Sequence, residues 1–398
     1  MNSVAAVEAR LRDAAWLRRD ETQAIFAILD GGAGRTRAVG GVVRDTVLDR
    51  QRGNPDIDLA TELLPTEVIE RAKAAGIAFY PTGIEHGTIT LRVDNLVAEV
   101  TTLRRDLQTD GRHAQVQFGT DWVEDASRRD FTLNALYAES DGTLLDPLDG
   151  LGDCLAGRVR FIGEPAARIA EDGLRVFRFF RFSASHGGEV FDAAGTAACA
   201  AAVDRLGHLS AERIGTEMSR MLALPQIATT LRAMSRIGLE RLDDGMLALL
   251  KAYERQSGRP QFHGRLALIL DRQAPDAVQR RWRLANADID AALAIKAASA
   301  LLVAFKINEA VYRFGEHLDL AIDVAAVMAG WGEAGKMAIT EQVHAIAPPT
   351  FPVGGKDLLA LGLQPGPAFG IVLDRLEQQW VESGFTLDRS ALLALAKV

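Results

Sequence analysis

The sequence predicts an α+β protein, with a small mixed β-sheet and helices in its N-terminal part and only helices in the remainder. Two observations predict this arrangement. Short stretches between residues 36 and 103 alternate polar with apolar residues and are separated by turn residues, which is typical of strands with one covered face. From about residue 155 onward this alternation fades, and Ala, Leu and Arg dominate, as in helices.

The composition is that of an ordinary globular chain. Its 398 residues are enough for two or three domains, and 48% are hydrophobic and 25% charged. There is no run of about 18 apolar residues and no signal-peptide core in residues 1–20, so we expect a cytoplasmic protein without a membrane span. The net charge of −8 argues against a generally basic coat but allows a local basic groove. Cys154 and Cys199 are too few for a disulfide framework and read as small core residues.

The first elements are a helical lead-in and a strand that runs into a glycine turn. Residues 4–30 show the helical spacing of apolar residues, and residues 36–43 read as a strand that enters a tight turn at Gly40 and Gly41. Glycine has no Cβ, so the backbone N–H groups of such a turn can approach phosphate oxygens. Arg44 then opens a short apolar-periodic segment, which we expect to be a helix whose N-terminus faces the phosphates.

Two carboxylates follow on the next predicted strand. Asp56 and Asp58 are two residues apart, and this spacing places both side chains on one face of a strand. Adjacent hard oxygen ligands suit Mg²⁺, which proteins bind through a few carboxylates together with substrate phosphates. The segment therefore predicts a Mg²⁺ site beside a phosphate-binding turn.

The pattern after these carboxylates predicts a helix, further strands and a loop. Pro65 begins a helix that Thr66 can cap. Three strands follow, at residues 78–80, 88–93 and 96–103. Glu99 lies on the last of them and is a candidate third carboxylate. Residues 105–127 are polar, with Thr109–His113 at the centre, and read as a mobile loop beside the site.

Each of these features also has an ordinary structural interpretation. A Gly-Gly pair is usually a plain turn, an Asp-x-Asp pair usually lies at a solvated strand edge, and Glu99 alone reads equally well as a strand residue facing water. The run Arg128–Asp130 alone would be a solvated helix start. The arginines spaced by three within residues 171–182 alone would form the solvated edge of an amphipathic helix. The combination of these motifs is more specific than any one of them.

The combination resembles the DNA polymerase beta nucleotidyltransferase superfamily and, within it, the class II tRNA branch of CCA-adding enzymes and bacterial poly(A) polymerases. The resemblance covers residues 36–220 and again 351–382, and its motifs occur in the family's order. The matching segments include Gly40–Asp45 with Asp56–Thr61, Glu99–Arg104, Arg128–Leu136, Asp146–Gly150, Glu171–Phe182, His208–Ile214 and Gly354–Leu363.

The resemblance implies roles for individual residues. Asp56 and Asp58 would hold Mg²⁺, and Glu99 would act as a further ligand or as the base for a hydroxyl proton. The nucleotide-binding residues would be Gly40, Gly41, Arg44, Arg129, Asp130, Asp172, Arg175, Arg178 and Arg181. Among them, Gly41, Arg44 and Arg129 would hold the triphosphate.

Asp172 and Arg175 suit base selection on this interpretation. Cytosine and adenine each present an amino donor beside a ring-nitrogen acceptor, whereas uracil and guanine present a carbonyl acceptor beside an N–H donor. A carboxylate only accepts hydrogen bonds and a guanidinium only donates them. Such a pair, one helical turn apart, would match C and A and oppose U and G.

The resemblance also implies four parts. These are a catalytic head at residues 1–152, a helical neck at 153–222 that recognises the nucleotide, a helical body at 223–345 and a helical tail at 346–398 that contacts tRNA. In the neck, Ser210 would cap a helix and Arg213 would brace it. In the tail, Lys356 and the adjacent glycines could meet an RNA phosphate.

The implied activity is addition of the C-C-A end to the 3′ terminus of tRNA from CTP and ATP, without a template and with Mg²⁺. The partners would be tRNA and the two nucleotides, with no membrane and no obligate protein partner. Poly(A) polymerase is the nearest alternative, disfavoured because the charged-Phe insert expected after the first carboxylates is not visible. A relative that adds only C-C or only A remains open. A non-catalytic RNA-binding protein on a degenerate head is disfavoured by the intact motifs.

Overall fold

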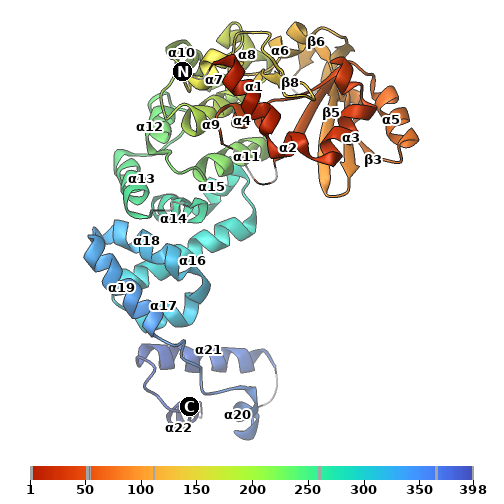
Figure 1. Ribbon diagram of the computed structural model, residues 1–398. Coiled ribbons are helices and arrows are strands. Elements are labelled where there is room, and N and C mark those ends of the chain that lie inside the picture. Colours follow the sequence, from red (N-terminus) through yellow and green to blue (C-terminus); the bar gives the residue numbers. More distant parts are fainter. Residues whose placement is uncertain are drawn as a thin grey trace. The chain divides into compact units, whose positions relative to one another are not determined.

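The computed structural model describes residues 3–50, 53, 55–110, 113–258, 261–363 and 366–396. The chain forms two compact units, one of Met1–Glu217 with Thr230–Arg241 and one of Met218–Thr229 with Leu242–Val398. The strands belong to the first unit, where Figure 1 draws them in red to yellow, and the described part of the second unit is helical. The α+β fold is therefore confirmed, whereas the division into head, neck, body and tail stays a prediction.

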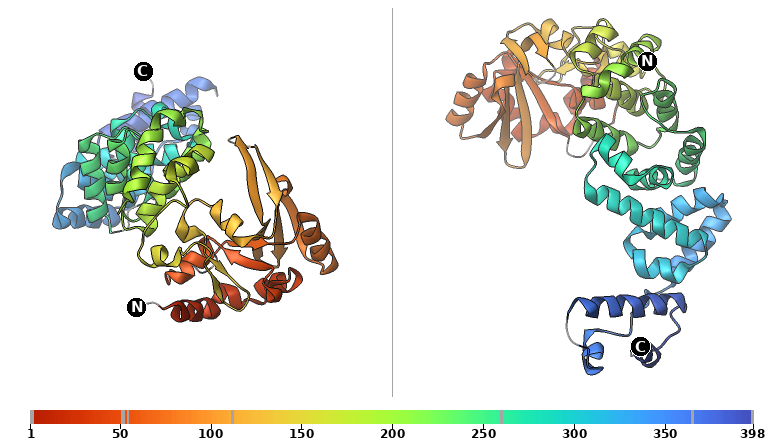
Figure 2. Two further views of the ribbon diagram at one scale, coloured as in Figure 1. Left: turned by 90° about the horizontal axis from the view of Figure 1, so that it is seen from above. Right: turned by 180° about the vertical axis from the view of Figure 1, so that it is seen from behind.

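The first unit is built on a mixed seven-stranded sheet with the order β3-β4-β5-β2-β1-β8-β9. Strands β2 and β5 pair in parallel, and the other neighbours pair antiparallel. The strands are β1 (Thr36–Val39), β2 (Ile57–Thr61), β3 (Ala78–Gly83), β4 (Thr88–Val93), β5 (Leu96–Thr102), β8 (Tyr137–Ala138) and β9 (Leu144–Leu145). Figure 2 shows from two further sides that strands are confined to this part of the chain.

One face of this sheet is covered and the other is open beside β5. In β5, Leu96, Ala98 and Val100 are buried, whereas Val97 and Glu99 between them are exposed. Helix α5 (Pro65–Ala74) contacts β3 and β4, and helix α3 (Asp20–Ile28) contacts β4. The alternation in the sequence therefore records which residues lie under these helices and which reach solvent.

The remaining helices of the first unit surround this sheet or follow it in the chain. The α-helices are α1 (Val4–Asp13), α2 (Ala15–Arg18), α4 (Gly41–Val47), α6 (Trp122–Ser127), α7 (Leu151–Leu155), α8 (Pro165–Glu171), α9 (Arg175–His186), α10 (Ala193–Ala202) and α12 (Ala228–Arg236). Helix α11 (Ala211–Leu222) begins in the first unit and ends in the second. Short 3₁₀ helices are η1 (Gly31–Ala33), η2 (Ile84–His86), η3 (Thr132–Asn134) and η4 (Val203–His208). Cys154 and Cys199 are buried and free, as predicted.

The predicted loop at residues 105–127 is wrong in its secondary structure. Strands β6 (Arg104–Asp110) and β7 (His113–Phe118) pair antiparallel as a separate hairpin, and α6 follows. Ladder hydrogen bonds join backbone groups, so a polar sequence can form a ribbon without an apolar face. Gly111 and Arg112 of the predicted loop lie outside the described residues.

The predicted cap of α5 is also wrong. Thr66 lies inside the first turn of the helix, which begins at Pro65 with Leu64 before it. The Oε2 atom of Glu67 accepts a hydrogen bond from the backbone N–H of Leu64 at 2.8 Å. A glutamate at this third helical position can reach back to the residue before the helix, so it caps the end without Thr66.

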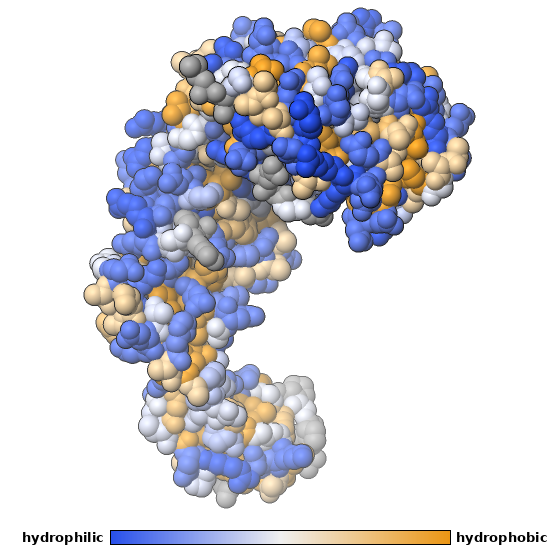
Figure 3. Space-filling model, viewed as in Figure 1, coloured by the Kyte–Doolittle hydropathy of each residue, from blue (hydrophilic) through white to orange (hydrophobic). Residues whose placement is uncertain are grey.

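The described part of the second unit consists of helices that bury apolar side chains between them. They are α13 (Asp244–Gln256), α14 (Phe262–Arg272), α15 (Pro275–Trp282), α16 (Asn286–Val303), α17 (Ile307–Phe314), η5 (Gly315–His317), α18 (Leu318–Ala329), α19 (Glu333–Ala345), α20 (Gly355–Ala360), α21 (Pro367–Glu382) and α22 (Arg389–Leu395). Trp282 and Tyr253 are fully buried, and Trp380 belongs to a cluster of buried apolar residues between Val353 and Ala396. Hydrophilic residues are spread over the face of the protein in Figure 3. Among the described helices, none combines the length and apolar character that a membrane crossing requires.

Candidate active site

The structure places Asp58 and Glu99, two of the three predicted carboxylates, side by side on the open face of the sheet. Asp58 on β2 is aligned with Glu99 on the parallel strand β5, and both side chains are exposed. Asp56 lies two residues before Asp58, just ahead of β2. Its negative charge acts on Asp58, as does that of Glu99. The same-face prediction from the sequence is therefore consistent with the strand register.

The electrostatics of this group favour a cation. Surrounding protein atoms desolvate Asp58, although one side of it is open, and this raises its pKa to about 6 together with the charges of Glu99 and Asp56. Arg129 opposes the rise. Hard oxygen donors that repel one another are a donor set that fits Mg²⁺. In the part of the chain that the structure describes, no three His, Cys, Asp or Glu side chains form a group that could hold a metal ion by themselves.

The glycine turn lies directly beside these carboxylates. Strand β1 ends at Val39, and Gly40 has φ 73° and ψ −125°, a backbone conformation that favours glycine. A Cβ atom built on Gly40 would be 4.0 Å from Oδ2 of Asp58. Helix α4 begins at Gly41. The predicted turn between strand and helix is confirmed, and it lies beside Asp58.

Arg44 lies behind this turn. It is buried, and its guanidinium donates to Oδ1 of Asp45 at 2.9 and 2.7 Å and to Oδ1 of Asn134 at 2.7 Å. The group therefore supports the turn from the protein interior. Direct contact between Arg44 and a triphosphate stays a prediction and would require some of these bonds to be exchanged.

Arg129 is oriented by two residues that sequence reasoning missed. Its Nη2 donates to Oδ2 of Asp125 at 3.1 Å, and its Nε donates to the Tyr137 hydroxyl at 3.1 Å. Tyr137 in turn donates to Asp125 at 2.8 Å, and Arg128 donates to the other oxygen of Asp125. The positions of Asp125, three and four residues before the two arginines, were a signal that could have identified it.

Asp130 joins the head to the predicted nucleotide-recognition helix. It is buried and accepts hydrogen bonds from the backbone N–H of Phe131, from Asn134 and from Arg178. Burial favours the neutral acid, but the charge of Arg178 and the hydrogen bonds that Asp130 accepts together outweigh it, so the pKa of Asp130 lies below its ordinary value. Asp130 therefore holds Arg178 in this structure, and its contact with a nucleotide stays a prediction.

The prediction that Asp172 and Arg175 share one face of a helix is wrong. Asp172 has extended backbone between α8 and α9, and α9 begins only at Arg175. The Asp172 carboxylate accepts from the backbone N–H of Leu174 at 3.1 Å and from Arg213 at 2.7 Å. An aspartate that bonds nearby backbone N–H groups favours a helix start over a helix interior. Ser210 caps the helix that carries Arg213, as predicted, because its Oγ accepts from the Arg213 N–H at 3.2 Å.

The arginines of α9 are engaged in hydrogen bonds and ion pairs. Arg175 donates to Glu171 at 2.7 Å and to the carbonyl oxygens of Arg168 and Arg128 at 3.0 Å. Arg178 and Arg181 both face Glu217 of α11, at 3.7 and 2.5 Å. Their roles in nucleotide binding stay predictions.

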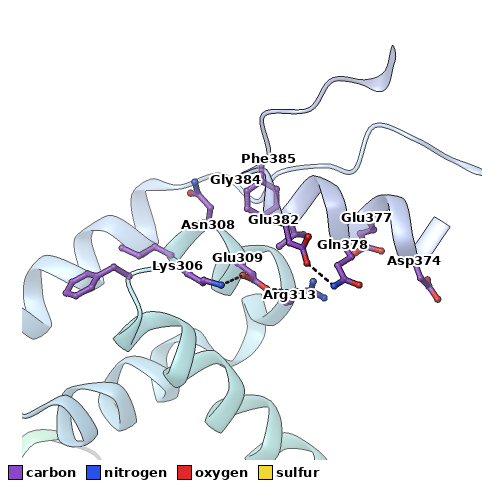
Figure 4. A pocket seen from close by; sticks show the side chains of 13 residues that line it. Lys306, Asn308, Glu309, Arg313, Asp374, Glu377, Gln378, Glu382, Gly384 and Phe385 are labelled. Atoms are coloured by element: carbon purple, nitrogen blue, oxygen red, sulfur yellow. Dashed lines mark hydrogen bonds and ion pairs between the residues drawn. The ribbon is translucent and has the colours of Figure 1, made fainter. Parts of the chain in front are cut away.

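A separate pocket occurs in the second unit and holds none of the predicted site residues. It has a volume of about 630 Å³ and lies between α17 and α21 (Figure 4). Within it Glu309 pairs with Lys306 at 3.8 Å and with Arg313 at 3.1 Å. Asp374, Glu377 and Glu382 also line the pocket, so its acidic side chains outnumber its two basic ones and disfavour a phosphate.

Polar groups of the turn near Lys356 already have partners within the chain. The N–H of Gly354 donates to Asp357 at 2.8 Å, and Asp357 pairs with Arg389. Contact between Lys356 and tRNA stays a prediction.

Comparison with known proteins identifies the family of this chain. Residues 36–160 match the model of the Poly A polymerase head domain. Over 383 residues the chain is 32% identical to CCA tRNA nucleotidyltransferase 1, mitochondrial, of Mus musculus, covering 91% of this chain and 86% of that one. Over 377 residues it is 32% identical to the CCA-adding enzyme of Limosilactobacillus fermentum, covering 90% and 91%.

The chain is also similar in fold to a solved structure. The CCA-adding enzyme of Bacillus stearothermophilus, crystallised in complex with CTP, has a TM-score of 0.74 and 27% identity and covers 95% of this chain and 97% of that one. A head of this fold, with carboxylates beside a glycine turn and helices after it, defines a nucleotidyltransferase. The chain belongs to the family of class II CCA-adding enzymes.

Proposed function

We propose that this protein adds the C-C-A end to tRNA from CTP and ATP without a nucleic-acid template. The observation that carries the proposal is the alignment of Asp58 with Glu99 on neighbouring strands, with Gly40 beside them. The likeness to CCA-adding enzymes over nine-tenths of the chain supports the same conclusion.

In the proposed reaction, the 3′-hydroxyl oxygen of tRNA attacks the α-phosphorus of the nucleotide, and the bond to pyrophosphate breaks. Asp56 and Asp58 would hold two Mg²⁺ ions, with Glu99 as a further ligand or as the acceptor of the hydroxyl proton. Bound Mg²⁺ supplies charge neutralisation at the reacting and leaving oxygens. Phosphoryl transfer of this kind depends on positioning and electrostatics rather than on covalent chemistry of the protein.

The triphosphate would lie along the backbone of Gly40 and Gly41, with Arg129 neutralising charge. Arg129 is suited to this because Asp125 and Tyr137 already fix its orientation. A guanidinium held in place by other groups loses little freedom when it meets a phosphate, so its binding energy is used for the substrate.

Base selection by Asp172 and Arg175 is part of the proposal. The contacts of these two side chains add one condition to it. The two side chains are bonded to Arg213 and Glu171, so a base would have to replace these partners. The Asp172 and Glu171 side chains are 30% and 28% exposed, which leaves them accessible for such an exchange. A wrong base would leave buried charges unpaired, and this is what makes rejection effective.

The test is incubation with tRNA that lacks its 3′ end, together with CTP, ATP and Mg²⁺. We expect a product of fixed length, extended by C, C and A. Long A-tails would indicate a poly(A) polymerase, arrest after C-C or addition of A alone would indicate a partial relative, and no extension would contradict the proposal. Asp94→Asn, which removes an exposed carboxylate at the turn after β4, is the matched control for substitutions in the site.

The cytoplasmic location stays a prediction, because the relatives include both bacterial and mitochondrial enzymes.

A further inference from the structure

Two groups of charged side chains meet at the junction of helices α4 and α9, which lie close together in Figure 1. The first consists of Arg44 and Asp45 on α4 with His186 at the end of α9, whose Nε2 is 3.2 Å from Oδ1 of Asp45. The second consists of Asp130, Arg178, Arg181 and Glu217. The first group lies behind the glycine turn, and the second lies along α9.

Asn134 connects the two groups. Its Oδ1 accepts from Nη1 of Arg44 at 2.7 Å, and its Nδ2 donates to Oδ1 of Asp130 at 3.0 Å. The side chain is buried, with an exposed fraction of 7%. An amide suits this position because one end accepts from a guanidinium and the other donates to a carboxylate.

Helix α9 closes the arrangement into a ring. Arg178 and His186 are eight residues apart, about 12 Å along the helix axis, and they contact Asp130 and Asp45 respectively. Phe182 lies between them on the same side of α9, and the Arg44 guanidinium is 5.1 Å from the centre of its ring. Helix α9 therefore contacts Asp45 of α4 through His186 and Asp130 through Arg178. Asn134 completes the ring because it joins Asp130 to Arg44 of α4, the helix that follows the glycine turn.

We propose that Asn134 is a positioning residue that holds the glycine turn in register with the nucleotide-recognition helix α9. The inference rests on the proposed function, in which the turn binds the triphosphate and the start of α9 reads the base. A nucleotide bound at both places spans the joint, so a shift of one element relative to the other misplaces the α-phosphate. Such a misplacement would slow the incorporation of CTP and of ATP alike.

The test compares Asn134→Asp with Asn134→Ala. The new carboxylate still accepts from Arg44 but places a second negative charge against Asp130. We expect kcat/KM for CTP and ATP at pH 8 to fall roughly 10–100-fold in both variants, because buried charged groups lose a hydrogen bond. Two adjacent carboxylates can share a proton, so Asn134→Asp should regain activity as the pH falls toward 6, relative to the wild type. Asn134→Ala should show no such recovery.

A merely structural role makes a different prediction. Thr36→Val serves as the matched control, because Thr36 is a buried polar residue of β1 that bonds Thr61 and the Leu29 carbonyl and does not touch the ring. If the losses in the Asn134 variants only follow the melting temperature, as in this control, or if Asn134→Asp keeps the wild-type pH profile, the positioning role is overturned.

The outcome stays decisive if Asn134→Asp fails to fold. Asn134→Ala should then raise the KM for CTP and ATP while the KM for tRNA changes less than twofold, and equal rises in all three would overturn the role. Inactivity of the wild-type protein toward tRNA without its 3′ end would instead refute the proposed function.

Discussion

Replacement of Asp125 by Asn is the sharpest probe of how the head orients its arginines. The Asp125 side chain is 1% exposed and accepts from Arg128, Arg129 and Tyr137. Loss of one member of a buried ion pair costs roughly 3–5 kcal/mol. Arg128 and Arg129 remain 18% and 20% exposed and can be partly rehydrated, so we expect a loss near the lower limit, about 3 kcal/mol.

The effect should depend on pH in a defined direction. Burial favours the neutral acid, but the charges of Arg129 and Arg128 outweigh it, so the pKa of Asp125 lies below its ordinary value. A carboxyl group of this kind stabilises the fold above its unfolded pKa of about 4, and this contribution disappears as the pH falls through the folded pKa. The difference in unfolding free energy between wild type and Asp125→Asn should therefore be full at pH 7 and shrink below about pH 4.

Activity should fall more than stability alone requires, because Arg129 loses the group that aims it at the triphosphate. We expect kcat/KM for CTP and ATP to decrease roughly 10–100-fold at a temperature where the variant is folded. The assays are steady-state incorporation and urea unfolding at several pH values. Glu124→Gln on the same helix removes only an exposed pairing with Arg105 at 3.7 Å and should be near wild type. Equal stability and equal kcat/KM for Asp125→Asn and Glu124→Gln would refute the reasoning.

Three further predictions follow from the site. Asp58→Ala should abolish nucleotide addition while a filter-binding assay still detects tRNA, since RNA affinity comes mainly from backbone contacts elsewhere; near-normal turnover in Mg²⁺ would remove Asp58 from the site. Arg175→Ala should weaken use of CTP and ATP and erode rejection of UTP and GTP, and unchanged four-way selectivity would show that the base is read elsewhere. Deletion of residues 351–398 should raise the KM for tRNA more than that for CTP, and an equal rise would indicate a folding role.

The carboxylates could be predicted from the sequence because strand parity alone sets the face on which they lie. For Asp56 and Asp58 the two-residue spacing was enough, whereas Glu99 was favoured only through the family resemblance, because the parallel register that aligns it with Asp58 was not evident. The pair Asp172 and Arg175 was misplaced for a local reason. The Asp172 side chain accepts a hydrogen bond from the Leu174 N–H, and a new helix starts after it. The periodicity of the sequence continues across this break and does not reveal it.

Tyr137 and Asn134 were missed for another reason. Their roles come from contacts with residues outside their own elements, such as Asn134 with Arg44. Asp125 differs from them, because its spacing from Arg128 and Arg129 was a signal within the sequence. Periodicity and spacing describe single elements, so they carry no information about such contacts. The hairpin β6–β7 was missed because its ladder depends on backbone groups that every residue possesses.

The parallel pairing of β2 with β5 also limits where insertions and deletions can occur in this part of the enzyme. Between the two strands the chain must cross over through α5, β3 and β4, and the turn at Asp94–Asn95 immediately precedes β5. One residue added between Leu96 and Glu99 would move Glu99 to the covered face and turn its apolar neighbours to solvent. Insertions and deletions compatible with activity should therefore fall outside the strands, so that the crossover can vary as a spacer while the alignment of Asp58 with Glu99 is kept.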